Sequence, residues 1–240
     1  EAKIKTGPNI FIFLIGGFGL GFLIPFMAIF IADLFNTKLE NTDDVENLTQ
    51  IQILDGIIHS NYKNNIPVFF YPQSGITESF RLLKVNLRNF LKELDKKVIS
   101  VNSLISGEGK SFISCNLAAV LSLSTSPKKV LLVEGDLRRP RLNKNFGTNE
   151  GIGLSSFLLN EKEFSEIIIE TSNVNLYFVP AGTIQPNPTE LLENGRFKKF
   201  IEYARKEFDY IIIDNAPISL VPDGLMTSKY ADINKILFIL

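Results

Sequence analysis

The stretch Val98-Ile-Ser-Val-Asn-Ser-Leu-Ile-Ser-Gly-Glu-Gly-Lys-Ser111 decides the fold of this chain. An apolar-rich run leads into a glycine-rich turn, and the helix-like segment Phe112–Leu123 follows it. Glycines in such a turn let backbone N–H groups approach a polyphosphate closely, and the helix directs its positive end at the same anion. The pattern predicts a phosphate-binding loop, a P-loop, whose contacting residues would be Ser106, Gly107, Glu108, Gly109, Lys110, Ser111 and Phe112.

Two side chains of this loop have expected roles. Lys110 reaches the β- and γ-phosphate oxygens, and the Ser111 hydroxyl is placed to ligate Mg²⁺. The strict motif has glycine where Leu104 stands, so the motif alone also fits a chance glycine-lysine turn. A strand before the turn and a helix after it favour the P-loop.

Two further apolar runs end in carboxylates. Val130–Arg138 contains Glu134 and Asp136, and Tyr210–Pro217 contains Asp214. Strands of a parallel sheet that is buried on both faces appear as continuous apolar runs, and ligands bind at their carboxyl ends. We therefore expect the three acids beside the P-loop, where Mg²⁺ favours carboxylate, phosphate and water oxygens. Taken alone, each acid could instead be an ordinary residue at a strand end with its side chain in solvent, outside any binding site.

The alternation of apolar strands and helical patterns predicts the α/β class, with a P-loop NTPase parallel sheet flanked by helices. An amphipathic helix is expected over Thr77–Leu94, a broken strand at Ile51–Ile58, and a proline-rich loop over residues 181–190. The other strands are expected at 97–103, 129–135, 174–180, 209–214 and 234–240, and the other helices at 110–124, 195–207 and about 221–229.

Composition limits the possible functions. The 240 residues carry a net charge of −1, so no global basic charge indicates nucleic acid as a partner. The single Cys115 is expected as a buried thiol on the P-loop helix, and one cysteine cannot form an internal disulfide. His59 is also alone, which disfavours a histidine metal site or a Ser/His/Asp triad.

Ile10–Ile31 carries no charged residue. As a helix it spans ~33 Å, enough to cross a bilayer with some tilt. A signal peptide is the alternative, but its apolar core is usually shorter and no small-residue cleavage site follows here. We predict one transmembrane helix at 10–31 between an extracytoplasmic flank, 1–9, and a juxtamembrane connector, 32–75, with a helix cap at Thr42 or Asp43. The P-loop domain would occupy 76–240 on the cytoplasmic side, where ATP is available.

Two charged groups have open interpretations. Glu78, Arg81 and Lys84 fall at intervals of three on the polar side of their helix, which by itself favours ion pairs on a solvated face. A basic turn follows the second apolar run and either is simply solvated or attracts an anionic partner. Its members are Arg138, Arg139, Arg141 and Lys144.

Together these motifs resemble the bacterial tyrosine kinases that are fused to a polysaccharide co-polymerase membrane segment. Ser106–Ser111 resembles the Walker A motif of that family, Glu134–Arg138 its second acidic motif, and Ile211–Pro217 its Walker B motif. The Glu78, Arg81 and Lys84 spacing resembles the helix through which family subunits pack into rings, and Val179–Leu192 is also similar to the family.

The chain departs from the family pattern at three places. Glu134 replaces the usual first aspartate, and Lys84 replaces an arginine, which keeps the charge but loses the bidentate fork. The sequence ends in the apolar run Ile236–Leu240, so a C-terminally incomplete kinase domain is expected, without the adenine-contacting region and the tyrosine-rich tail. A preceding periplasmic portion and first membrane helix are likewise expected outside this sequence.

The resemblance implies an ATP-dependent protein-tyrosine kinase of the bacterial inner membrane that serves exopolysaccharide or capsule synthesis and export. ATP and Mg²⁺ would be its cofactors, and its partners would be the membrane, the export machinery and further copies of itself in a ring. Lys110, Glu134, Asp136 and Asp214 would be catalytic, and Ser111, Asp136 and Asp214 would hold the metal directly or through water. Glu134 or Asp136 would accept the tyrosine proton, and the family pattern favours Glu134.

Two other functions are possible. A positioning or partition ATPase shares the expected fold but has a lysine where Ile105 stands here. A degenerate chain-length regulator that binds nucleotide without transferring phosphate is favoured only by Glu134. Among the six tyrosines, we expect Tyr62 and Tyr71 to be accessible and Tyr177, Tyr203 and Tyr210 to be packed.

Overall fold

A computed structural model describes residues 10–34, 53–54, 56–91, 97–124, 126, 128–148 and 151–232. The chain forms two compact units, Glu1–Ile53 and Leu54–Leu240. The second unit contains the P-loop and begins at Leu54, whereas the sequence analysis placed the start of the P-loop domain at residue 76.

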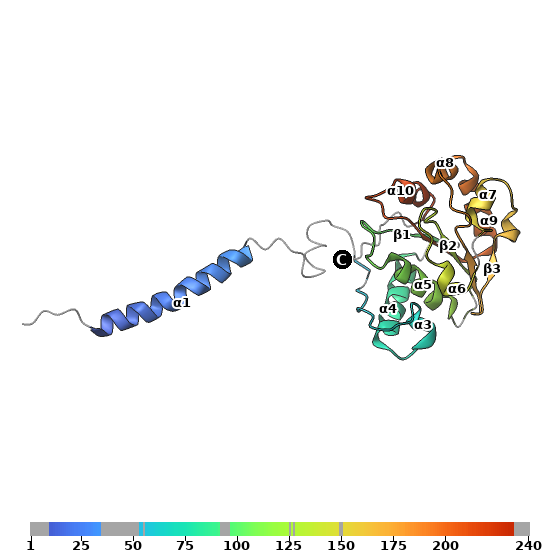
Figure 1. Cartoon of the computed structure of the whole chain (residues 1–240). Helices are drawn as coiled ribbons and strands as arrows, with labels where there is room; N and C mark the ends of the chain where they lie inside the picture. The colour runs from blue at the N-terminus through green and yellow to red at the C-terminus, as the bar shows by residue number, and fades with distance from the viewer. Residues whose placement is uncertain are drawn as a thin grey trace, which may run out of the picture. The chain divides into compact units, whose positions relative to one another are not determined.

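The described part of the first unit is helix α1, Ile10–Leu34 (Figure 1). It is apolar all round, with a mean hydropathy of 2.3 over its candidate span Ile10–Asp33, and the side chains of that span are exposed. By length and composition it is long and apolar enough to cross a membrane. The prediction of an apolar helix at 10–31 is confirmed, whereas the predicted cap at Thr42 or Asp43 lies outside the described residues.

The second unit is built on a five-stranded sheet in the order β1-β5-β2-β4-β3. Strands β1, β5, β2 and β4 are parallel, and only the edge strand β3 runs antiparallel to its neighbour β4. Strand β5 therefore lies between β1 and β2, the first two strands of the sequence. The bounds are β1 Lys97–Val101, β2 Val130–Glu134, β3 Ile169–Glu170, β4 Leu176–Val179 and β5 Tyr210–Asp214.

Helices cover both faces of this sheet (Figure 1). Helices α3, α4 and α5 pack together on one face, and α7, α8 and α9 pack on the other, with α10 against α8. The bounds are α3 Pro67–Phe70, α4 Gly75–Phe90, α5 Lys110–Ser122, α6 Asn143–Phe146, α7 Leu154–Leu158, the 3₁₀ turn η1 Phe164–Glu166, α8 Pro188–Glu193, α9 Arg196–Glu207 and α10 Asp223–Ser228.

Both faces of the sheet are buried, which explains the uninterrupted apolar strands. Alternate residues of β2 enter different cores: Val130 and Leu132 pack with α4 and α5, whereas Leu131 and Val133 pack with α7 and α9. A strand flanked by helices on both sides needs apolar residues at every position. The predicted α/β class is thus confirmed.

Most predicted elements are present, and their ends differ from the predicted ones by at most four residues. Two expectations are wrong. The described residues of 51–58 form no strand. Residues 188–190, which were expected in the loop, begin helix α8, because Pro188 occupies the first turn, where proline needs no N–H partner. The predicted parallel sheet also carries one antiparallel edge strand, β3, which was not anticipated. The predicted strand 234–240 lies outside the described residues.

Asn116 of α5 joins the segment before α4 to the P-loop helix. Its amide Nδ2 donates to the carbonyl of Asn65 at 2.9 Å, and its Oδ1 accepts from the N–H of Val68 at 3.3 Å. Ile66 and Val68 are buried in the same core as α4 and α5. Residues 65–68 are therefore held beside the helix that begins at the P-loop.

Candidate nucleotide-binding site

The P-loop connects β1 to the N-terminus of α5. Gly107 and Gly109 have φ of +100° and +85°, a left-handed conformation that favours glycine, and Gly109 caps α5. The Glu108 carboxylate accepts from the N–H groups of Leu104 at 2.8 Å and Ile105 at 3.3 Å, which braces the start of the loop. Within the described part of the chain, no backbone N–H from residues 106–112 has an acceptor, so this row of donors is free to bind an anion.

Asp214, at the end of β5, closes the other side of the loop. Its carboxylate is buried and lies 3.4 Å from the Lys110 ammonium. The hydroxyls of Ser111 and Ser114 donate to its two oxygens at 2.7 and 2.9 Å. Burial raises the pKa of Asp214, although Lys110 and the serine hydroxyls oppose that shift. The structure thus brings Lys110, Ser111 and Asp214 together, as the sequence analysis predicted.

Glu134 lies in register with Asp214 on the neighbouring strand. One carboxylate oxygen accepts from the N–H groups of Arg141 and of Leu142, the latter at 2.6 Å, and the other accepts from the N–H of Ala181 at 3.3 Å. Burial raises the pKa of Glu134, against the effect of the three N–H donors. Three backbone donors therefore hold the buried Glu134 carboxylate, an arrangement that favours a positioning role over the expected role as proton acceptor.

Asp136 lies two residues further on, outside the strand, and is only partly buried. Its Oδ1 accepts from the N–H groups of Arg138 at 3.2 Å and Arg139 at 3.0 Å. No described residue donates to Oδ2. Of the two acids at the end of β2 and just beyond it, Asp136 therefore has the oxygen that is available to a substrate or to a metal ion.

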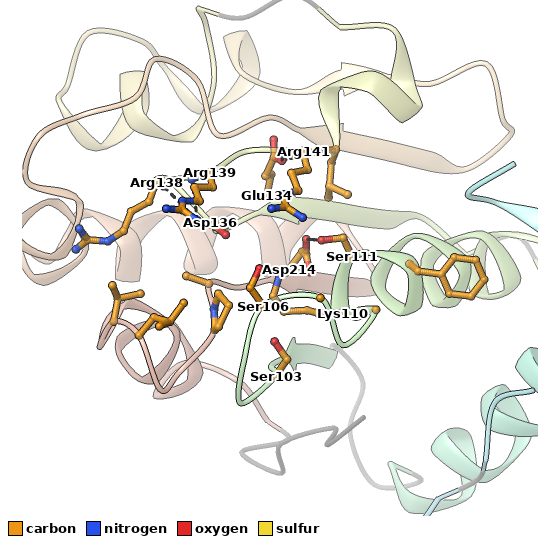
Figure 2. Close-up of a pocket in the computed structure, with 18 of the residues that line it drawn as sticks. Ser103, Ser106, Lys110, Ser111, Glu134, Asp136, Arg138, Arg139, Arg141 and Asp214 are labelled. Carbon is orange, nitrogen blue, oxygen red and sulfur yellow. Dashed lines mark hydrogen bonds and ion pairs between the residues drawn. The ribbon is translucent and has the colours of Figure 1, made fainter. Parts of the chain in front are cut away.

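A cavity of about 510 Å³ joins these groups, as Figure 2 shows. This volume is within the range of small-molecule sites. One side is the P-loop, the opposite side carries the acids and arginines that follow β2, and the apolar residues Pro217, Leu220 and Val221 lie beyond β5. No group of three Asp, Glu, His or Cys suited to a metal was found among the described residues, as is usual where one or two carboxylates bind Mg²⁺ with phosphates and water.

Arg138 lines this cavity, but its guanidinium is bonded to residues outside it. Its guanidinium bonds the buried Asp223 of α10, with Nε to Oδ2 at 2.7 Å, and also the Thr189 hydroxyl of α8 at 2.9 Å. Thr189 in turn donates to Asp223 at 2.6 Å. This cluster ties the loop that carries Asp136 to two helices on the far face of the sheet.

Other residues of the cavity were not anticipated. Ser114 lies behind the cavity, fully buried, where it bonds Asp214, and it could have been found as the residue one helical turn after Lys110, on the same face of α5. Asn65 and Asn145 line the cavity and bond each other at 3.0 Å, but they are 80 residues apart and no sequence pattern links them. Phe112, which was expected to contact the nucleotide, lies in the cavity wall.

Outside the cavity, the charged stripe on α4 separates into two parts. Arg81 forms an ion pair with Glu78 on the exposed face, whereas Lys84 is half-buried and donates to the carbonyl of Val120, near the end of α5, at 2.7 Å. Lys84 is therefore not part of a solvated stripe. Cys115 is fully buried beside Asn145, which confirms the predicted buried thiol.

Together, the parallel sheet, the free N–H row and the Lys110–Asp214 pair define a P-loop nucleotide-binding domain. Residues 96–233 match the AAA domain family. The chain is 38% identical over 156 residues to "Tyrosine-protein kinase CpsD" of Streptococcus agalactiae, covering 65% of this chain and 66% of that protein. It is 33% identical over 177 residues to "Tyrosine-protein kinase ptk" of Acinetobacter johnsonii, covering 73% and 24%.

A crystal structure of the chimerical protein CapA2B2 has a similar fold, with a TM-score of 0.71 and 30% identity over 80% of this chain and 82% of that one. The chain belongs to the bacterial tyrosine kinase family, within the AAA domain family. It spans about a quarter of the length of ptk and about two thirds of that of CpsD.

Proposed function

We propose that this protein is an ATP-dependent protein-tyrosine kinase. The observation that carries the proposal is the cavity in which the free N–H row of the P-loop faces the Asp136 carboxylate. Phosphoryl transfer requires mainly that phosphates and acceptor be positioned and that charge be neutralised. The curated relatives named above are tyrosine-protein kinases, which supports tyrosine as the acceptor.

ATP would be held by the backbone of 107–112 and by Lys110, which can leave Asp214 for the β- and γ-phosphates. Ser111 and Asp214 would hold Mg²⁺ directly or through water, and Asp136 would contact it only through water, so that its Oδ2 can accept a proton; the donor set fits, because two carboxylates and a hydroxyl border the phosphate position. When bound, Mg²⁺ supplies charge neutralisation on the phosphate oxygens. The Ser111–Asp214 hydrogen bond at 2.7 Å supports this pairing.

We assign proton acceptance from the tyrosine hydroxyl to Asp136. Its Oδ2 is available and its side chain lines the cavity, whereas both Glu134 oxygens already accept backbone N–H bonds. A free tyrosine has a pKa of about 10, so this base acts chiefly as the proton transfer develops. Glu134 would hold the 141–142 turn and the chain at Ala181 in place.

The wider setting is also proposed. Helix α1 would anchor the chain in the bacterial inner membrane, with residues 32–240 in the cytoplasm and residues 1–9 outside, and the protein would act in exopolysaccharide or capsule export. Copies of the chain would assemble in a ring through the α4 face that carries Glu78 and Arg81. The exposure of that ion pair supports this face as available for contact.

The proposed kinase activity can be tested with purified protein, ATP, Mg²⁺ and a soluble glutamate–tyrosine copolymer as acceptor. We expect label on tyrosine in the wild type and its loss in Asp136→Asn, with Asp209→Asn as the control because Asp209 lies outside the cavity. ATP hydrolysis without transfer to tyrosine would favour the partition-type ATPase. Binding of ATP without either reaction would favour the degenerate regulator.

A further inference from the structure

Four cations follow β2, and the structure gives them different surroundings. Arg138 is engaged by Asp223 and Thr189, and Lys144 does not line the cavity. Arg139 and Arg141 are exposed and line it. Figure 2 shows Arg138 and Arg139 on the side of Asp136, whereas the Arg141 side chain extends from the region of Glu134 toward Ser111 and Asp214.

The Arg141 guanidinium has no acceptor among the described residues, although its backbone is firmly held. The N–H groups of Arg141 and Leu142 both donate to the buried Glu134 carboxylate, which is in register with Asp214 on the next strand. Glu134 thus fixes the position of the Arg141 backbone opposite the P-loop. A preorganised cation that faces the phosphate position can stabilise charge as it develops.

On this geometry we propose that Arg141 is a catalytic residue that contacts the phosphoryl group during transfer, with Glu134 as its positioning residue; this rests on the proposed kinase function. In the reaction, the bond from the γ-phosphorus to the β–γ bridging oxygen breaks and its electron pair stays on ADP. A bond from that phosphorus to the tyrosine oxygen forms, and the phenolic proton passes to Asp136. Arg141 neutralises the charge on the oxygens of the phosphoryl group that is being transferred. It belongs to the same chain as the P-loop that holds the nucleotide.

The test compares Arg141→Ala with Arg139→Ala, which removes an exposed arginine from the same cavity. Both variants keep the backbone N–H, so the bond of residue 141 to Glu134 is retained. Besides turnover, the measurements are the Kd of ADP–Mg²⁺ and the trapping of ADP with aluminium fluoride, a mimic of the transferring phosphoryl group. For Arg141→Ala we expect kcat to fall about 100- to 1,000-fold and trapping to be lost, with the ADP Kd within about threefold of wild type. Arg141→Lys should restore trapping in part.

Equal trapping and turnover in the two alanine variants would overturn the role of Arg141. An ADP affinity that falls as far as kcat would make it a general nucleotide-binding residue, and a raised KM for an acidic acceptor alone would make it an acceptor-docking residue; either result also overturns the proposal. If the wild type transfers no phosphate to tyrosine but still traps aluminium fluoride through Arg141, the kinase assignment fails while the contact to the phosphoryl group stands.

Discussion

At the scale of single residues, Lys110 is the group on which phosphate binding depends most. It lies 3.4 Å from Asp214 and is nearly buried, so its ammonium is held at the base of the cavity. We predict that Lys110→Met abolishes phosphoryl transfer and weakens ATP binding about 10- to 100-fold, the loss of one charge-assisted bond. Calorimetric titration with ATP–Mg²⁺ measures this.

Lys128→Met is a matched control, because Lys128 pairs with Asp209 at 3.3 Å and does not line the cavity. It should bind ATP as the wild type does. Unchanged ATP affinity in Lys110→Met would remove the basis for placing the nucleotide at this loop.

The raised pKa of Asp214 makes the free energy of unfolding depend on pH. Burial raises the pKa of this carboxyl in the folded protein, so the folded state holds its proton more tightly than the unfolded chain does. The stability that this proton contributes is complete below the unfolded pKa of about 3.9 and is lost as the pH rises through the raised folded pKa. Asp214→Asn lacks this titration and should lose less stability than the wild type as the pH is raised from about 4 to 7.

Urea unfolding without nucleotide across that pH range measures the effect, and Asp209→Asn controls for removal of a carboxylate outside the cavity. Parallel curves for the wild type and Asp214→Asn would contradict the prediction. With Mg²⁺ and ATP, the order should reverse, because Asp214→Asn would lose the ligand-linked stabilisation.

At the scale of elements, α4 uses two of its charges in different ways. Lys84 donates to the Val120 carbonyl, one of the last in α5, and burial lowers the pKa of its ammonium. We predict that Lys84→Met lowers the free energy of unfolding by about 1 kcal/mol, the usual net contribution of such a bond. Chemical denaturation measures this, and Arg81→Met should change stability much less, since exposed pairs contribute little.

A charge reversal at Arg81 on the same helix tests the proposed ring. Arg81→Glu should weaken self-association while it leaves the fold and ATP binding intact, because Arg81 is exposed and pairs only with the neighbouring Glu78 among the described residues. Sedimentation velocity gives the oligomeric state. The same distribution of species before and after the change would favour the solvated-face interpretation of this stripe.

At the scale of the whole molecule, the fold decides which tyrosines can be acceptors. Tyr62, Tyr71 and Tyr203 are 43%, 40% and 41% exposed, whereas Tyr210 is 6% exposed. Tyr203 packs its ring against Phe164, 5.7 Å between centroids, as expected, but it remains 41% exposed. We predict little autophosphorylation in this chain, restricted to the three exposed tyrosines, as read by mass spectrometry after incubation with ATP–Mg²⁺.

Tyr210 is the internal control, because it lies in β5 and local unfolding would have to expose it first. More phosphate on Tyr210 than on Tyr62 would contradict the prediction. Lys110→Met treated in parallel should carry no label, which excludes a contaminating kinase.

The sequence by itself determined the P-loop, the strands β1, β2 and β5, the acids at the ends of β2 and β5, and the helix α1. Each of these is a local pattern: a glycine turn needs particular backbone angles, and a strand buried on both faces needs an unbroken apolar run. Because carboxyl ends of parallel strands share one edge of a sheet, the meeting of Lys110, Ser111 and Asp214 also followed from these patterns.

Only the tertiary structure decided how the available oxygens and cations are used. Glu134 and Asp136 are two residues apart, yet the oxygens of Glu134 accept N–H groups from Arg141, Leu142 and the distant Ala181. Lys84 donates a hydrogen bond to the carbonyl of Val120, 36 residues away in the sequence. Arg138 donates to the carboxylate of Asp223, 85 residues away. A hydrogen bond or an ion pair depends on which groups meet in space, and when those groups come from distant segments no local pattern records the contact.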